Sequence, residues 1–308
     1  MKHFFDQAQR LPEDTSQNAV ESFFRGQNAS GLIEKQLHSG KSVILLFANG
    51  SPSAAYQLEN GLGTFITHGE FSAVQNEVAN VRALQLPDVA GRLTLLALES
   101  QIGDELAMPD SVIWQAQLEK WKQARWSGLV EVESNDLQGL ALFWQGELQT
   151  SDVIFSTASG FVTELPKAGI FPWKVTTYLP VPTAQGYQCA ILRLGAVHWS
   201  FRILSRYQEM VGQKLLQTMD RELNRQIQPW RWKIALTDSN MLDTHFFPYL
   251  MDAAHAYRAL FMAMGAQMNF VIGSNLTLRL LNETFEQIHP DERALLQSQR
   301  LIPAAFSE

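Results

Sequence analysis

The chain has 308 residues, of which 46% are hydrophobic and 18% are charged, so it can bury a sizeable core and is too long for one small module. Its 24 Lys and Arg residues against 31 Asp and Glu residues give a formal net charge of -7, which excludes a broad basic surface. We therefore expect a folded protein of two or three domains whose main partner is not nucleic acid.

The sequence predicts a cytoplasmic protein. A single cysteine, Cys189, cannot form an internal disulfide, and the amino terminus lacks the continuous apolar stretch of a secretion signal. Polar residues interrupt the longest apolar-rich stretch, residues 246–272, and each is costly in hydrocarbon. No membrane span is therefore expected. The interrupting residues are Asp252, His255, Arg258, Gln267 and Asn269.

The most informative feature is an internal repeat with a period of about 96 residues, the size of a small domain, which indicates a tandem duplication. In each repeat an Asp suited to cap a helix, Asp14 or Asp110, precedes a helical segment. Both helical segments lead into the same tripeptide, Ser-Gly-Leu, at residues 30–32 and 127–129. A strand is expected to begin there in both repeats.

A β-hairpin is predicted after each Ser-Gly-Leu, with strands at residues 32–37 and 42–50 in the first repeat and at 129–133 and 139–146 in the second. The first glycine of each repeat is expected to end its helix with a positive φ, and the second follows the return strand. These four glycines are assigned structural roles. They are Gly31, Gly50, Gly128 and Gly146.

Each repeat is expected to close with a second hairpin, at residues 80–99 and 174–194, because proline and glycine stand at matching positions in the two segments. The repeat then reads helix, hairpin, link, hairpin. This order predicts an antiparallel sheet that is covered on one face by a helix.

The arrangement of helix, Ser-Gly-Leu, strand, and a second strand that ends in glycine and small residues resembles the PATAN domain. That family is named after the amino-terminal region of a cyanobacterial patterning response regulator. The resemblance covers residues 14–56 and 110–155. The family's alanine after the second glycine is matched at residues 54–55, whereas Thr and Ser stand at 150–151. The resemblance implies a non-catalytic bacterial signalling module, found beside receiver and small-GTPase-linked domains, with no active site to transfer.

The last third of the chain is predicted to be mainly helical. Apolar residues recur at steps of four from Tyr207 to Ile227, which indicates a long helix that ends at Pro229. The elements expected next are a short strand or a bridging segment at residues 230–236, a helix that begins after Asp243 or Thr244 and ends near residue 272, and two shorter helices at residues 274–287 and 290–300.

Seven of the nine methionines fall in this last third, and their flexible thioethers can either fill irregular gaps in a core or form an adaptable contact surface. The core interpretation is favoured, since a helix that is apolar on most sides is usually buried. Self-association through these helices stays open. The methionines are Met210, Met219, Met241, Met251, Met262, Met264 and Met268.

Residues 40–42, Gly-Lys-Ser, invite comparison with a phosphate-binding loop, in which backbone N–H groups and a lysine hold phosphates. Lys35 stands where that loop requires an earlier glycine, and an apolar strand follows where a helix is required. We interpret the segment as a polar hairpin turn and expect Lys41 to bind no phosphate.

The remaining reactive residues show no spacing typical of a catalytic or metal site. The seven histidines include no His-Glu-x-x-His pair, and His198 is expected on a strand face. Cys189 is interpreted as a small buried hydrophobic residue. Glu131 and Glu133 are expected to point to solvent from one strand face. The sequence therefore predicts no catalytic residue, no metal ligand and no cofactor.

The predicted fold class is α+β. Two related units, each a helix with an antiparallel sheet, are expected at residues 1–108 and 109–204, and a mainly helical domain at residues 205–308.

These features favour a cytoplasmic, non-enzymatic bacterial signalling adaptor or scaffold that acts through protein–protein contacts. The expected partner is a protein, such as a response regulator or a small GTPase system, and the C-terminal helices are the expected place for any homo-oligomer contact. The alternative is a small-molecule or nucleotide-binding regulator whose ligand site lies between the two repeat units.

Overall fold

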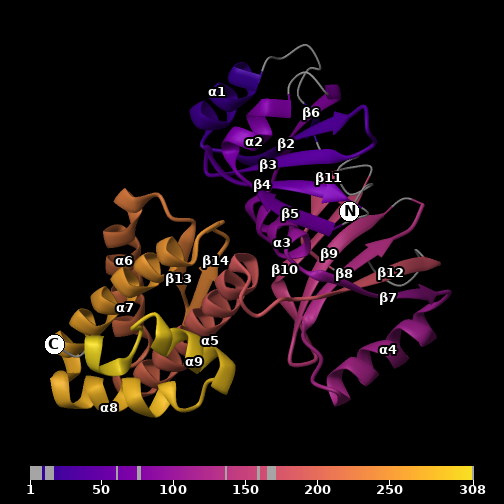
Figure 1. The fold of residues 1–308 in the computed structure, drawn as a ribbon. Coiled ribbons are helices and arrows are strands. Elements are labelled where there is room, and N and C mark those ends of the chain that lie inside the picture. The colour runs from indigo at the N-terminus through magenta and orange to yellow at the C-terminus, as the bar shows by residue number, and fades with distance from the viewer. Residues whose placement is uncertain are drawn as a thin grey trace. The chain divides into compact units, whose positions relative to one another are not determined.

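The computed structural model describes residues 9–10, 17–59, 62–74, 78–135, 137–157, 160–164 and 171–306. The chain divides into two compact units, residues 1–187 and residues 188–308. The first unit contains two antiparallel sheets and the second is mainly helical, so the predicted α+β class is confirmed (Figure 1). The predicted helix cap Asp14 lies outside the described residues.

The first sheet has the strand order β1-β6-β2-β3-β4-β5, with every described neighbour antiparallel. The predicted first hairpin is present as β2 and β3, in which Gly31 lies opposite Phe47. The strands are β1 (Gln9–Arg10), β2 (Ser30–Leu37), β3 (Ser42–Ala48), β4 (Ser51–Glu59), β5 (Leu62–Ile66) and β6 (Val78–Leu86).

The second sheet has the same strand order, β7-β12-β8-β9-β10-β11, when its strands are counted from the first of the repeat. The predicted hairpin is present as β8 and β9, in which Gly128 lies opposite Phe143. Equivalent strands therefore hold equivalent places in the two sheets. The strands are β7 (Gln101–Met108), β8 (Gly128–Glu133), β9 (Gln138–Trp144), β10 (Glu147–Thr157), β11 (Gly160–Val162) and β12 (Trp173–Leu179).

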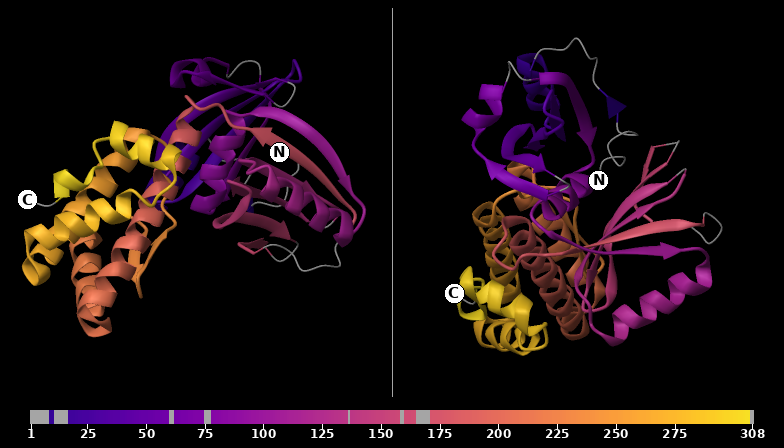
Figure 2. Two further views of the ribbon diagram at one scale, coloured as in Figure 1. Left: turned by 90° about the horizontal axis from the view of Figure 1, so that it is seen from below. Right: turned by 45° about the vertical axis from the view of Figure 1, so that its right-hand side comes forward.

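One face of each sheet is covered by helices of its own repeat. In the first, α1 (Gln17–Gln27) and α2 (His68–Ala73) pack on the sheet around the buried rings of Phe24, Phe47 and Phe71. In the second, α4 (Ser111–Gln123) lies along the sheet (Figure 2) and buries Trp114 and Trp121 against it. As predicted, Asp110 caps α4, since its carboxylate accepts hydrogen bonds from two backbone N–H groups of the first turn.

The second hairpin predicted for each repeat is wrong. In both repeats a strand leads instead into a helix: β6 is followed by α3 (Asp88–Leu98), and β12 by α5 (Gln185–Val211). Pro87 stands at the N-cap of α3, where its missing N–H does no harm, instead of in a turn. The helix α3 contacts strands of both sheets and is buried along its length, so no face of it is polar enough to reveal a helical period.

These elements cross the boundaries that the sequence suggested. The predicted boundary after residue 108 separates β7 from β12, with which it pairs in the second sheet. The predicted boundary after residue 204 falls within α5.

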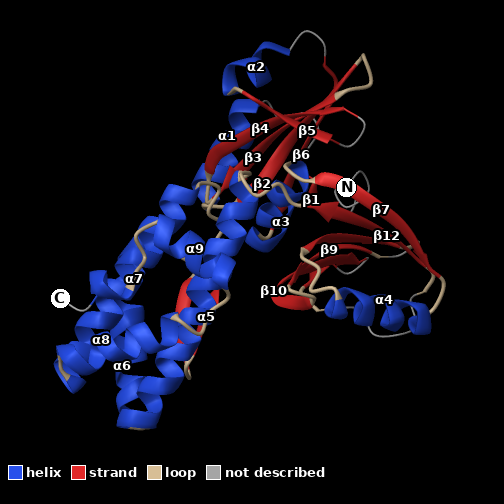
Figure 3. Ribbon diagram, turned by 60° about the horizontal axis from the view of Figure 1, so that its bottom comes forward, coloured by secondary structure: helices blue, strands red, loops and turns tan. Residues whose placement is uncertain are grey.

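The second unit is a group of helices with one short hairpin (Figure 3). Its core includes Trp199, Tyr207, Tyr257 and Phe261. Within the described ranges, none of the helices is both long and apolar enough to cross a membrane. After α5 the elements are α6 (Gln213–Ile227), the short 3-10 helix Gln228–Trp230, β13 (Ile234–Thr237), β14 (Asn240–Asp243), α7 (Leu250–Ile272), α8 (Ser274–Phe285), α9 (Pro290–Ser298) and the 3-10 helix Pro303–Phe306.

The two short helices near the C-terminus match the predicted segments closely, whereas two other predictions need correction. The long helix predicted up to Ile227 is broken at Gly212, whose φ of +82° is rarely adopted by other residues. Asp243 does not cap α7. Its carboxylate instead accepts hydrogen bonds from His245 N at 2.9 Å and from the Tyr257 hydroxyl at 2.5 Å.

Candidate functional site

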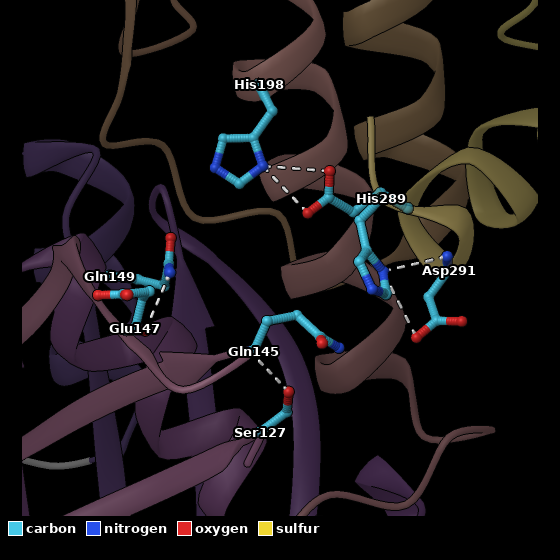
Figure 4. Close-up of polar contacts among 8 residues, drawn as sticks. Ser127, Gln145, Glu147, Gln149, His198, His289 and Asp291 are labelled. Atoms are coloured by element: carbon cyan, nitrogen blue, oxygen red, sulfur yellow. Dashed lines mark hydrogen bonds and ion pairs between the residues drawn. The ribbon is translucent and has the colours of Figure 1, made fainter. Parts of the chain in front are cut away.

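The tripeptide Ser-Gly-Leu connects the helix of each repeat to a two-residue turn further along the chain. In the first repeat this turn, residues 49–50, lies between β3 and β4, and in the second repeat it is residues 145–146, between β9 and β10. Ser30 Oγ accepts a hydrogen bond from Asn49 N at 3.2 Å, and Ser127 Oγ accepts one from Gln145 N at 2.9 Å (Figure 4). The next N–H of each turn donates to the residue before the serine, Ala29 O or Trp126 O. The two repeats therefore share one junction, in which a serine hydroxyl holds a β-turn.

Gly50 and Gly146 occupy the second position of these turns, with φ values of +82° and +81°. The residues before them also have positive φ, which defines the two-residue type I′ turn that matches the twist of a hairpin. A Cβ on Gly146 would lie 2.5 Å from Lys122 Cα, and one on Gly50 would lie 2.9 Å from Phe24 O. Both glycines are thus required by backbone conformation and by close packing.

The predicted positive φ of Gly31 and Gly128 is wrong, because both glycines lie inside strands. The residues that end the helices with positive φ are Asn28 and Arg125. The reason for the two glycines is steric. A Cβ on Gly31 would overlap Leu84 O and the Phe24 ring, and one on Gly128 would overlap the Trp126 ring and lie 2.8 Å from Tyr178 O.

A buried carboxylate lies three residues after each of these glycines. Glu34 is paired with Arg82, whereas Glu131 accepts a hydrogen bond from the Tyr178 hydroxyl at 2.5 Å. Burial raises the pKa of Tyr178 above its usual range, and the nearby Glu131 carboxylate raises it further. The expectation that Glu131 points to solvent is therefore wrong, because its strand is covered on both faces.

Lys35 is buried on the opposite face of the first sheet. Its Nζ donates a hydrogen bond to Phe71 O at 2.9 Å and lies 4.0 Å from the centre of the Phe71 ring. Burial lowers the pKa of Lys35, and the carboxylate of Glu21 opposes that shift. Because Phe71 O is near the C-terminal end of α2, the ammonium group interacts favourably with the helix dipole. These contacts give Lys35 a structural role.

Lys41 lies in the loop between β2 and β3, as the hairpin interpretation predicts. Its Nζ forms an exposed ion pair with Glu59 at 3.1 Å. Leu37 N donates a hydrogen bond to Lys41 O at 2.8 Å, which closes a short loop. The segment after this loop is an antiparallel strand, not a helix. The geometry of a phosphate-binding loop is therefore not present at this position.

His198 and Cys189 of the second unit do not lie where the sequence suggested. His198 is on α5, not on a strand, and its Nδ1 lies 3.0 and 3.1 Å from the two oxygens of the buried Glu292 (Figure 4). His289 Nδ1 accepts a hydrogen bond from Asp291 N and caps α9. Cys189 is also on α5 and is half-buried, not fully buried.

Across the residues that the structure describes, no three His, Cys, Asp or Glu side chains gather closely enough to hold a metal ion. A comparison with known protein families, with characterised proteins and with solved structures found no match to this chain.

The surface of the first unit best suited to a partner is the edge of its second sheet. β7 is the last strand of that sheet and pairs, among the described strands, with β12 alone. Seven of its eight residues are exposed or half-buried, and Ile102 is 40% exposed. On the neighbouring strand β12, Leu179, which pairs with Gln101, is 44% exposed. Just after β7, the first turn of α4 exposes Val112. We call β7, Leu179 and Val112 the β7 surface.

No clear pattern in the sequence indicates the β7 surface. Residues 101–108 mix apolar and acidic side chains without alternation, and a strand with solvent on both faces produces no period of two. The pairing of β7 with β12 joins segments more than 60 residues apart, which no local pattern records.

Proposed function

We propose that this protein is a non-enzymatic bacterial signalling adaptor or scaffold, with two PATAN-like repeats, that acts through protein–protein contacts. The observation that carries the proposal is the β7 surface. An edge strand presents unpaired backbone N–H and C=O groups, which an extended segment of another protein can extend as an additional strand. The exposed apolar side chains beside this edge supply contact area for such a partner.

The contacts of α3 support the adaptor over a ligand-binding regulator. A ligand site between the two repeats needs open space there, and α3 contacts strands of both sheets in that region. Arg92 of α3 forms an ion pair with the buried Asp152 of β10 at 2.7 Å. Tyr56 of β4 donates a hydrogen bond at 2.6 Å to Glu99, the residue that follows α3. Through α3, these contacts connect the first sheet with the second.

The experiment measures direct binding by calorimetry between the full chain and any receiver domain or small GTPase that is found encoded beside its gene. We expect one of these proteins to bind, and Ile102→Glu and Val112→Glu to weaken that binding by more than about tenfold. Phe65→Glu is the matched control, because Phe65 is 65% exposed on the edge strand of the first sheet. Equal affinities for all variants would reject the β7 surface.

A thermal-shift screen of nucleotides and metabolites tests the alternative directly. A ligand that binds only the folded state raises the melting temperature, by an amount that grows with its concentration. The adaptor proposal expects no such rise. A nucleotide or metabolite that raises the melting temperature, together with no binding to any of the neighbouring signalling proteins, would replace the adaptor with a ligand-binding regulator.

A further inference from the structure

The helix α7 is apolar on two faces, and only one of them is buried in the core of the second unit. The inner face includes Ala253, Tyr257, Leu260, Met264 and Met268, each less than 2% exposed. Only two residues of this 23-residue helix, Asp252 and Arg258, carry a full charge. A helix with so few charges usually has both faces covered.

The outer face of α7 carries an exposed stripe. Met251 is 75% exposed, Met262 55% and Phe270 89%, and between them lie the exposed His255 and Ala266 and the half-buried Ala259. At 100° per residue these side chains fall within an arc of about 100°, the width of a contact face. We call these six residues the α7 stripe. Trp230, which is 55% exposed, extends it, since its ring lies 5.9 Å from the His255 ring.

The spacing of the α7 stripe is the same in both directions along the helix. Its six residues are separated by four, four, three, four and four positions. This series reads the same backwards, so a helix that is turned end over end about the point between Leu260 and Phe261 presents the stripe at the same positions. A two-fold axis produces this reversal, because in an isologous dimer each residue faces the residue at the mirrored position of the other copy.

We propose that α7 packs antiparallel against α7 of a second copy of this chain, with the two-fold axis between Leu260 and Phe261. Ala259 then faces Met262 of the second copy, and His255 faces Ala266. A small side chain thus opposes a large one in both inner layers, which lets the helices approach closely near the axis. At the ends Met251 faces Phe270, and two large side chains there suit helices that diverge from a central crossing.

The charges of the helix are compatible with this pairing. The reversal places Asp252 opposite Asn269 of the second copy and Arg258 opposite Ala263. Like charges therefore do not meet, and Asn269 can offer a hydrogen bond to the carboxylate. A second copy is the occupant that the pattern favours, because an unrelated partner would not require a stripe that matches its own reversal. The dimer does not depend on the adaptor proposal, which concerns the first unit.

The first test is the mass of the full chain in solution by sedimentation at about 10 µM, a concentration at which a specific dimer of ordinary affinity is populated. We expect the parent chain to be dimeric and Met262→Lys to be monomeric. Met210→Lys is the matched control, because Met210 is 45% exposed on α5, outside the stripe, and this variant should remain dimeric. Superimposable far-ultraviolet circular dichroism spectra of the two variants and the parent establish that folding is intact, since loss of a dimer by itself lowers the melting temperature. A monomeric parent chain overturns the proposal.

Disulfide trapping tests the antiparallel arrangement. In a Cys189→Ser background, differently tagged chains with Met251→Cys and with Phe270→Cys should form a mixed disulfide on oxidation. Met251→Cys alone should not cross-link with itself, because the two copies of residue 251 lie about 28 Å apart along antiparallel helices. Efficient cross-linking of Met251→Cys with itself indicates parallel helices and overturns the proposed pairing.

Discussion

The two repeats cover the same glycine with different aromatic rings. In the first, the Phe24 ring of α1 lies over Gly31 and stacks on Phe47 at 4.7 Å. In the second, Trp126 lies over Gly128 and stacks on Trp121 at 4.8 Å. The ring thus comes from the helix in one repeat and from the short segment between the helix and its strand in the other. The requirement that both repeats share is a strand residue without a side chain beneath an aromatic ring.

The buried carboxylates show a second difference. Glu34 and Glu131 are the third residues after these glycines, but Glu34 meets a guanidinium group and Glu131 a neutral hydroxyl. The backbone position of the carboxylate is therefore common to both repeats, while its partner differs. The second repeat has the partner that titrates in the alkaline range, so the two repeats should respond differently to pH.

Gly31→Ala and Gly128→Ala should have the largest effects on stability. A Cβ at either position meets a backbone oxygen of the neighbouring strand, which cannot move without breaking the sheet. Gly31→Ala should lower the free energy of unfolding by about 3 kcal/mol, since the Phe24 ring is also fully buried. Gly128→Ala should cost about 2 kcal/mol, because the half-buried Trp126 ring can shift. Chemical denaturation that gives the parent midpoint for both variants would reject the shared packing requirement.

Gly146→Ala should lower the free energy of unfolding by about 2 kcal/mol, because a left-handed residue with a side chain is strained and the new Cβ would meet Lys122 Cα. Gly40→Ala is the matched control. Gly40 has the same φ of +81°, but nothing lies within 4 Å of an added Cβ, so only the conformational cost of about 1 kcal/mol remains. Urea denaturation of both variants separates the cost of packing from the cost of backbone strain. Equal losses of unfolding free energy in the two variants would show that close packing around Gly146 does not contribute.

Tyr178→Phe should lower the free energy of unfolding by about 2 kcal/mol at pH 7, because a hydrogen bond to a buried carboxylate is lost. The pKa of Tyr178 is raised in the folded state. Above pH 10 the unfolded chain therefore loses this proton while the folded chain keeps it, and stability falls as pH rises. The parent should lose about 1.4 kcal/mol more per pH unit than Tyr178→Phe in that range. Parallel pH profiles of the two proteins would contradict this assignment.

The smallest difference is expected between Ser30→Ala and Ser127→Ala. Both serines accept a hydrogen bond from the turn, but Ser30 Oγ also donates to Asp88 at 2.6 Å. Ser127→Ala should therefore cost about 1 kcal/mol and Ser30→Ala about 2 kcal/mol, at roughly 1 kcal/mol for each bond. Thermal unfolding of the two variants measures the difference. A larger loss of stability for Ser127→Ala than for Ser30→Ala would contradict the contribution assigned to the second hydrogen bond of Ser30.

The elements that the sequence predicted correctly have strong local signals. Asp110 marks the start of α4, Gly273 separates α7 from α8, and apolar segments on both sides of short polar loops mark the hairpins β2-β3 and β8-β9. Capping, positive φ and short apolar runs bounded by polar turns each act within a few residues, so a single sequence contains them. The structural roles of Gly50 and Gly146 could be predicted for the same reason.

The candidate contact surfaces could not be predicted in this way. The seven methionines near the C-terminus divide by burial: Met219, Met241, Met264 and Met268 are in the core, and Met210, Met251 and Met262 are exposed. Because both faces of α7 are apolar, its sequence does not indicate which face the core covers. The β7 surface could not be predicted either, because β7 becomes an edge strand only through its pairing with β12, which is far from it in the sequence.

The sequence by itself determined the α+β class, the repetition of a helix and a hairpin, and the positions of the turns, since these depend on propensity and spacing within short segments. The tertiary structure decided the rest. It made the segment after β6 a helix by burying it against both sheets, and it made Gly31 and Gly128 necessary by bringing rings and carbonyl groups onto them. Such constraints arise between residues that are far apart in the chain, where packing outweighs local preference.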